Sequence, residues 1–212
     1  MYLFSRRTRL RPGQTMKAMT WALEQTERVN RIVDTPVSLY SQVFSPDVGT
    51  LAWSSFVPDL ATLESAEAKL MVDEAYVSAI DSGADFFEGG VHDSVVSLIH
   101  GEPDPKRQIE YVSTVRAICA SGNLGKGMAV GVEICELADS ITGLSTLFGA
   151  GMTGPYGSVG WFTGHADIAS VEESSAKLVE DPRWLEFIDR EAGTVYQDGP
   201  SATMQTVFRR LA

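Results

Sequence analysis

The side chains best suited to acid–base chemistry in this chain are its three histidines, His92, His100 and His165. An imidazole whose pKa lies near its usual value of about 6.5 can accept or donate a proton at neutral pH. His165 follows a glycine-rich stretch and, by the two-residue period of a strand, shares a face with Trp161. The three histidines are scattered, without the short spacing that is typical of a metal site. His165 is therefore the candidate catalytic residue, and we expect no metal ion.

The glycine-rich stretch contains a second signal, because Gly149, Gly151 and Gly154 match the dinucleotide-binding pattern G-x-G-x-x-G. That pattern requires a strand before the glycines and a helix after them. Here Pro155 leads into a further strand, so the stretch is predicted to form a hairpin that binds no nucleotide. Another glycine stretch, residues 122–127, does precede a helix, but its spacing differs from that of a phosphate-binding loop. We interpret it as a plain loop, with an anion at the start of the helix as the alternative.

The 212-residue chain is acidic, with 17 Lys and Arg against 28 Asp and Glu and a net charge of −11. Sequence-independent binding of nucleic acid depends on Lys and Arg side chains that neutralise phosphates, so this class of function is excluded. The one basic cluster consists of Arg6, Arg7, Arg9 and Arg11 on a predicted strand. We interpret these four side chains as solvated or salt-bridged.

The two cysteines, Cys119 and Cys135, lie among apolar residues. Two cysteines alone form neither a disulfide framework nor a zinc site, so both are predicted to be buried, reduced thiols. No apolar stretch reaches the roughly 18 residues of a membrane span, and the first 30 residues lack the apolar run of a signal peptide. We therefore expect a cytoplasmic protein that does not contact a membrane.

The chain repeats itself at one offset, which pairs Trp53 with Trp161. At the same offset Ala68-Lys69-Leu70 meets Ala176-Lys177-Leu178, and no gap interrupts the match across the middle of both halves. A repeat this long indicates a duplicated domain and not a solenoid unit. We predict a first repeat over residues 1–100, a Pro-rich and charged linker over 101–107, and a second repeat over 108–212.

Each half has the pattern of a βαββαβ unit, which is the ferredoxin-like order. Asp59 and Asp167 stand where N-caps of the second helices belong. The predicted elements of the first half are strands 2–10, 37–44, 49–56 and 91–100 with helices 16–33 and 60–82. Those of the second half are strands 109–120, 145–150, 157–163 and 202–211 with helices 128–141 and 168–191.

Two ferredoxin-like halves, each with a tryptophan on its third strand, resemble the dimeric α+β barrel superfamily. The segment from Ala176 to Trp184, with Phe187 after it, is similar to the second helix of NIPSNAP-like and EthD-like members. The superfamily also includes antibiotic-biosynthesis monooxygenases and haem-degrading monooxygenases. The resemblance implies an α+β fold in which two antiparallel sheets pack face to face as an α+β barrel, within one duplicated chain.

The resemblance also implies a ligand cavity between the sheets. We expect Trp161, His165, Tyr111 and Arg116 to line it, with Trp53 on the opposite wall, and the ligand to be a small hydrophobic or aromatic molecule. The alternative is that both tryptophans are simply core residues. Haem-degrading members hold iron through a histidine in or near the second helix, and neither 60–82 nor 168–191 contains one, so haem is not expected.

The function implied by the resemblance is oxidation, isomerisation or cyclisation of an aromatic or polyketide-like substrate without a cofactor. The alternative is a non-catalytic carrier, or a structural pseudo-dimer whose inter-sheet core is packed. The sequence leaves open whether the protein is an enzyme and whether the duplicated chain forms a homodimer.

Overall fold

The computed structural model describes residues 1–198 and 202–212. The chain divides into two compact units, of which unit 1 comprises Met1–Val95 with Arg209–Ala212 and unit 2 comprises Val96–Phe208. Strands β4 and β8 each cross this division. None of the helices in the described part of the chain is long and apolar enough to span a membrane.

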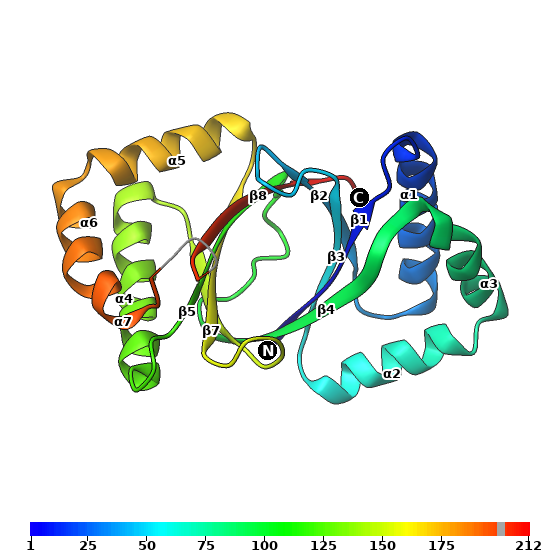
Figure 1. The fold of residues 1–212 in the computed structure, drawn as a ribbon, viewed down its shortest axis with the longest axis horizontal. Helices are drawn as coiled ribbons and strands as arrows, with labels where there is room; N and C mark the ends of the chain where they lie inside the picture. Colours follow the sequence, from blue (N-terminus) through cyan, green and yellow to red (C-terminus); the bar gives the residue numbers. More distant parts are fainter. Residues whose placement is uncertain (199–201) are drawn as a thin grey trace. The chain divides into compact units, whose positions relative to one another are not determined.

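In unit 1, the helices cover one face of an antiparallel sheet (Figure 1). Strand β1 pairs with β3, and β3 pairs with β2. Residues after β8 extend the sheet, because Leu39 exchanges backbone hydrogen bonds with Leu211 and Ala212. The elements are β1 (Tyr2–Leu10), α1 (Thr15–Ile32), β2 (Ser38–Val43), β3 (Thr50–Val57), α2 (Leu60–Met71), α3 (Glu74–Gly83), the 3-10 turn η1 (Ala84–Phe86) and the first part of β4 (Phe87–His100).

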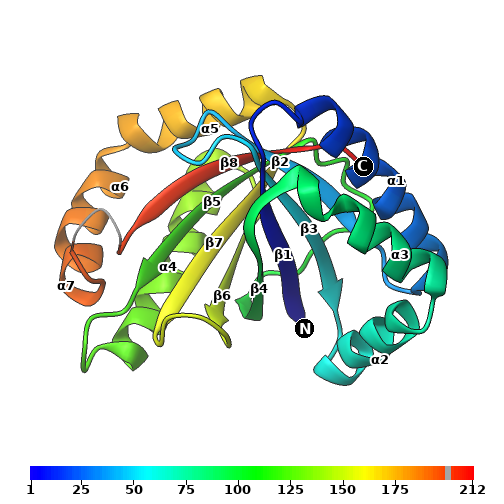
Figure 2. The same ribbon diagram turned by 45° about the vertical axis from the view of Figure 1, so that its right-hand side comes forward.

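Unit 2 repeats this plan, and its helices again lie on one face of the sheet (Figure 2). Strand β7 pairs with both β5 and β6, and β6 pairs with the second part of β4. Leu39, Leu51 and Ala22 form the core between helix and sheet in unit 1, as Phe148 and Trp161 do in unit 2. The elements are β5 (Tyr111–Ile118), α4 (Leu124–Thr142), β6 (Thr146–Gly151), β7 (Ser158–His165), α5 (Ile168–Glu180), α6 (Pro182–Phe187), the π-helical turn η2 (Ile188–Ala192), α7 (Gly193–Val195) and β8 (Met204–Arg210).

The hydrogen-bonded order of the strands is β1-β3-β2-β8-β5-β7-β6-β4, which is that of a closed barrel. The predicted α+β class, the two βαββαβ series and the barrel are therefore confirmed. The glycine-rich stretch forms the hairpin of β6 and β7, as predicted, and Gly154 and Gly157 in its turn have positive φ angles of 90° and 80°. A glycine adopts this backbone without the strain that a Cβ would add.

The predicted N-caps are also confirmed. The Asp59 carboxylate accepts a hydrogen bond from the backbone N–H of Thr62, and Asp167 accepts one from Ser170. Each cap satisfies a donor that has no partner within the helix.

Two helix predictions were wrong in extent. The single helices expected over 60–82 and 168–191 are each divided by an aspartate that caps a new helix: Asp73 accepts from the N–H of Tyr76, and Asp181 from that of Arg183. Pro182 adds to the second break because it has no N–H to continue the preceding helix.

Helix α4 also begins at Leu124 and not at Met128, so much of the stretch 122–127 is helical and not a loop. Gly127 lies in the first turns of α4, where a Cβ would be 2.6 Å from Sγ of Cys119. Its carbonyl accepts a 2.6 Å hydrogen bond from the hydroxyl of Tyr196. A glycine in this helix thus lets three elements approach closely.

Candidate functional site

Trp161 of β7 lies in the core beneath α4. Only 6% of it is exposed, and its indole N–H donates a 2.9 Å hydrogen bond to the carbonyl of Gly131. Its ring packs against Phe148 and Tyr196, with centroids 5.1 and 5.4 Å away. The side chain therefore faces the helices, and the expectation that it lines a cavity between the two sheets was wrong.

Trp53 has the equivalent position in unit 1. Its indole N–H donates a 2.9 Å hydrogen bond to the hydroxyl of Thr26 on α1, and its ring packs edge-on against Trp21 of the same helix. Both third-strand tryptophans thus join the sheet to the first helix of their repeat. The alternative prediction, that both tryptophans are core residues, therefore agrees with their surroundings.

His165 ends β7 on the same face as Trp161 and is 1% exposed. Its Nε2 lies 2.9 Å from the hydroxyl of Ser113 on β5, and its Nδ1 lies 3.5 Å from that of Ser170 on α5. Burial lowers the pKa of His165, the charge of Arg107 acts in the same direction, and a backbone hydrogen bond with Ser170 and the charge of Asp167 oppose them. This environment favours the neutral imidazole as a link between strand and helix; the catalytic role of His165 stays a prediction.

The lowered pKa of His165 predicts a loss of stability in mild acid. Below the usual pKa of about 6.5 the unfolded chain takes up a proton that the folded protein does not. The free energy of unfolding should therefore fall with pH from about 6.5 downwards, by at most about 1.4 kcal/mol per pH unit. Urea unfolding between pH 7 and pH 5 measures this slope. The same slope in His165→Gln would contradict the assignment, because glutamine does not titrate.

Tyr111 and Arg116 of β5 point to opposite faces of the sheet. Tyr111 pairs with His165 and therefore shares the helix-covered face, whereas Arg116 pairs with Gly160 on the other face. One guanidinium N–H of Arg116 lies 3.5 Å from the sulfur of Met204 on β8. The expectation that Arg116 lines one surface with Tyr111, His165 and Trp161 was therefore wrong.

The face of each sheet that no helix covers is called its free face here. In unit 2 the free face carries the glycines of the hairpin strands, with Gly149 directly opposite Gly160. A Cβ at Gly160 would lie 2.9 Å from the ring of Phe162. The glycines thus let neighbouring side chains lie flat against the backbone. This close packing explains why the hairpin contains so many glycines.

The free face of unit 1 is polar. The hydroxyls of Ser5 and Ser54 lie 3.1 Å apart in one row across the strands. In the next row Arg7 pairs with Ala52, and Ala52 pairs with Tyr40. Ala52 itself is buried, with 3% of it exposed.

Gln42 follows Tyr40 on the same face of β2 and is 6% exposed. Its amide Nε2 is buried and has no hydrogen-bond partner within residues 1–198 and 202–212. An unsatisfied buried donor costs about 1–3 kcal/mol, so an acceptor at this position would stabilise the protein. Sequence reasoning missed both residues; the signal was the alternation in Ser38–Val43, which sets Tyr40 and Gln42 opposite the fully buried Leu39.

Burial raises the pKa of Tyr40, while the charge of Arg210 and a hydrogen bond with Ser38 act in the opposite direction. The phenol is therefore protonated at neutral pH and can donate a hydrogen bond. We call Arg7, Tyr40, Gln42 and Arg210 the polar row of unit 1.

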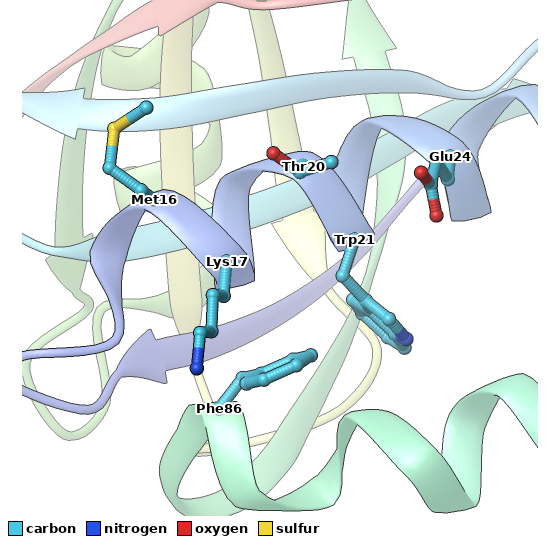
Figure 3. A pocket seen from close by; sticks show the side chains of 6 residues that line it. All are labelled: Met16, Lys17, Thr20, Trp21, Glu24 and Phe86. Atoms are coloured by element: carbon cyan, nitrogen blue, oxygen red, sulfur yellow. The ribbon is translucent and has the colours of Figure 1, made fainter.

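A hollow of about 390 Å³ lies on the helix side of unit 1, between α1 and η1 (Figure 3). Met16, Lys17 and Glu24 border it with the rings of Trp21 and Phe86, whose centroids are 6.4 Å apart. Trp21 is held by a hydrogen bond from its indole N–H to the carbonyl of Ala79 and by its packing against Gly83. These contacts join α1 to α3 beside the hollow.

The cysteine prediction is confirmed for burial, since Cys119 and Cys135 are both buried and form no disulfide. Burial raises the pKa of Cys135 to about 12, which leaves an unreactive thiol. Within residues 1–198 and 202–212, no three His, Cys, Asp or Glu side chains are grouped as metal ligands.

Comparison by sequence finds no matching family model and no similar curated protein. Comparison of structures finds a "putative monooxygenase" from Fusobacterium nucleatum at 9% identity with a TM-score of 0.72, covering 100% of this chain and 92% of the other. An "anthrone oxidase-like protein" matches at 12% identity and a TM-score of 0.65, covering 100% and 91%. A "putative monooxygenase" from Lactobacillus acidophilus matches at 9% identity and a TM-score of 0.64, covering 99% and 93%. The chain therefore shares its fold with these solved structures.

Proposed function

We propose that this protein binds a small aromatic or polyketide-like molecule on the free face of unit 1 and oxidises, isomerises or cyclises it without a cofactor. The observation that carries the proposal is the buried amide of Gln42, whose donor has no partner among the residues that the structure describes. The fold supports the same class of function, because proteins described as monooxygenases and as anthrone oxidase-like share it. We place the protein in the cytoplasm as part of this proposal.

The roles within the polar row follow from its hydrogen-bonding groups. The Tyr40 hydroxyl and the Gln42 amide can both donate to an oxygen of the substrate. Hydrogen bonds that strengthen as charge develops on that oxygen lower the barrier to forming an enolate. Solvent water takes up the C–H proton of an anthrone-type substrate as the enolate forms. The enolate reacts with O2 at that carbon, and the resulting peroxide anion regains a proton and loses water to give the quinone. Anthrone and O2 thus yield anthraquinone and water, with no further reductant.

The competing function is a structural or carrier protein in which the free face only packs. A face built only for packing would bury apolar side chains, because an unpaired buried amide is destabilising. The distinction can therefore be made at Gln42 itself.

The test is the oxidation of anthrone by the purified chain without added flavin, haem or metal, followed by O2 uptake and by absorbance of anthraquinone. We expect Gln42→Leu to lower the rate about 10-fold or more, the effect of one lost hydrogen bond in the transition state. Gln25→Leu is the matched control, because Gln25 is also a buried amide with an unpartnered atom but lies on α1. It should leave the rate unchanged.

Two results would contradict the proposal. One is the absence of any turnover or binding with anthrone and related tricyclic phenols. The other is an equal loss of rate in the two glutamine variants, which would reflect a general loss of structure. If Gln42→Leu raises the free energy of unfolding and no ligand is found, the structural function is favoured.

A further inference from the structure

The turn between β2 and β3 in unit 1, residues 44–49, exposes two large apolar side chains. Phe44 is 82% exposed and Val48 is 63% exposed. Phe44 is also the one described residue other than glycine that has a positive φ angle, of 50°. This backbone is unfavourable for a bulky side chain, and residues held in it cluster at sites of binding and function. Because most of the Phe44 ring is in solvent, packing within unit 1 does not account for a phenylalanine here.

The hollow between α1 and η1 is the matching feature of the same unit. Its volume of about 390 Å³ exceeds that of a phenylalanine side chain, and Lys17 and Trp21 extend from α1 toward Phe86 (Figure 3). Trp21 is fixed in place, because its indole N–H donates to the carbonyl of Ala79 and its ring packs edge-on against Phe87. The hollow therefore has a rigid aromatic floor that is open to solvent.

The turn and the hollow lie at the same end of the sheet. The N–H of Leu10 donates to the carbonyl of Gly49 in the turn, and the N–H of Arg11 donates to the carbonyl of Phe86 beside the hollow. Both features thus flank the end of β1. A second copy related by a twofold axis can therefore engage both at once, with the turn of each copy in the hollow of the other.

The charges beside the two features are complementary. Asp47 is exposed in the turn, close in sequence to Phe44, and Lys17 borders the hollow. Neither side chain forms an ion pair with residues 1–198 or 202–212. Glu24 also borders the hollow, but it lies about two turns further along α1, roughly 10 Å from Lys17 by the rise of a helix. The carboxylate beside Phe44 is therefore suited to the Lys17 end of the hollow.

We propose that the chain forms a twofold dimer in which Phe44 of each copy enters the hollow of the other and Asp47 pairs with Lys17. An aromatic side chain buries about 150–250 Å², and stable interfaces bury about 1,200–2,000 Å² in total, so this contact is small. We expect a weak dimer, with a Kd of about 100 µM. The net charge of −11 on each copy opposes association, and salt at about 0.15 M limits this repulsion to a range of about 8 Å. The hollow lies on the helix side of unit 1, so the inference does not depend on the function proposed for the free face.

Sedimentation equilibrium of the full chain, at about 10–500 µM protein and about 0.15 M salt, measures the association. Phe44→Gly should weaken dimerisation about 10-fold or more and should not destabilise the fold, because glycine readily adopts a positive φ. Tyr156→Gly is the matched control, because Tyr156 is 88% exposed in the turn between β6 and β7. It should leave dimerisation unchanged. A chain that stays monomeric throughout, species larger than a dimer, or equal losses in the two variants would overturn the inference.

Charge reversal tests the pairing of Asp47 with Lys17 directly. Lys17→Glu and Asp47→Lys should each weaken self-association about 10-fold, because like charges then face each other at both contacts of the dimer. In an equimolar mixture of the two variants, opposite charges face each other again at both contacts of the mixed dimer. The mixture should therefore associate about as well as the original chain. A mixture that associates no better than its two components would refute the proposed contact, whatever the effect of Phe44→Gly.

Discussion

Replacing Trp161 with alanine is expected to lower the free energy of unfolding by about 3–5 kcal/mol. The indole fills the space between α4 and β7, and its loss also leaves the carbonyl of Gly131 without the hydrogen bond from the indole N–H. Both losses occur in the core cluster that includes Phe148 and Tyr196. Urea unfolding measures the change, with the slope against urea concentration checked for constancy.

Trp184 is the matched control, because it is a tryptophan packed against the same cluster but only partly buried. Its replacement by alanine should cost less than half as much. Equal costs at the two positions, or a loss below about 1 kcal/mol at Trp161, would contradict the placement of Trp161 beneath α4 and reopen its assignment to a ligand site.

The second large effect is expected where a helix passes very close to the sheet. Gly131 lies in α4, and a Cβ at this position would be 2.7 Å or less from three atoms of the Phe148 ring. Phe148 is fully buried and cannot move aside. Gly131→Ala should therefore destabilise the protein by about 1–3 kcal/mol, although alanine is the better helix former.

The same substitution at Gly125 serves as the control. Gly125 is in the same helix, and a Cβ there would meet no atom within 4 Å. Gly125→Ala should leave stability unchanged or raise it by up to about 1 kcal/mol. A stabilised Gly131→Ala variant in the same thermal unfolding experiment would show that α4 does not pack against Phe148 in this way.

The fold could be predicted because the duplication presents the same βαββαβ order twice in the sequence. An ambiguous strand or helix in one half could be checked against its counterpart, and both N-cap aspartates, Asp59 and Asp167, stood at matching positions. The internal caps Asp73 and Asp181 also match in sequence, but an aspartate in a long helical pattern is read equally well as part of a polar face. The division of the helices therefore needed the structure.

The site was less predictable, because the period of a strand separates two faces without saying which one the helices cover. Trp161 and His165 were correctly placed on one face together, and the error lay in the choice of face. Tyr111 and Arg116, however, are five residues apart, so an odd spacing already set them on opposite faces. The polar row could not be found from the sequence, because Arg7 and Arg210 lie at the two ends of the chain and are aligned only by the pairing of β1, β3, β2 and the residues around Leu211.

The participation of Arg209–Ala212 in unit 1 has a consequence for how this chain folds. The edge of β2 obtains its partners for Leu39 only after the ribosome has made all of unit 2. Until then the sheet of unit 1 is incomplete, and the backbone N–H and C=O groups along the edge of β2 lack their strand partners while unit 2 is synthesised. Closing so long a loop costs conformational entropy, and contacts of such high sequence separation slow folding. The pairing of these last residues with β2 also places Arg210 near Tyr40. The polar row therefore forms late in folding, in the same step that completes the sheet.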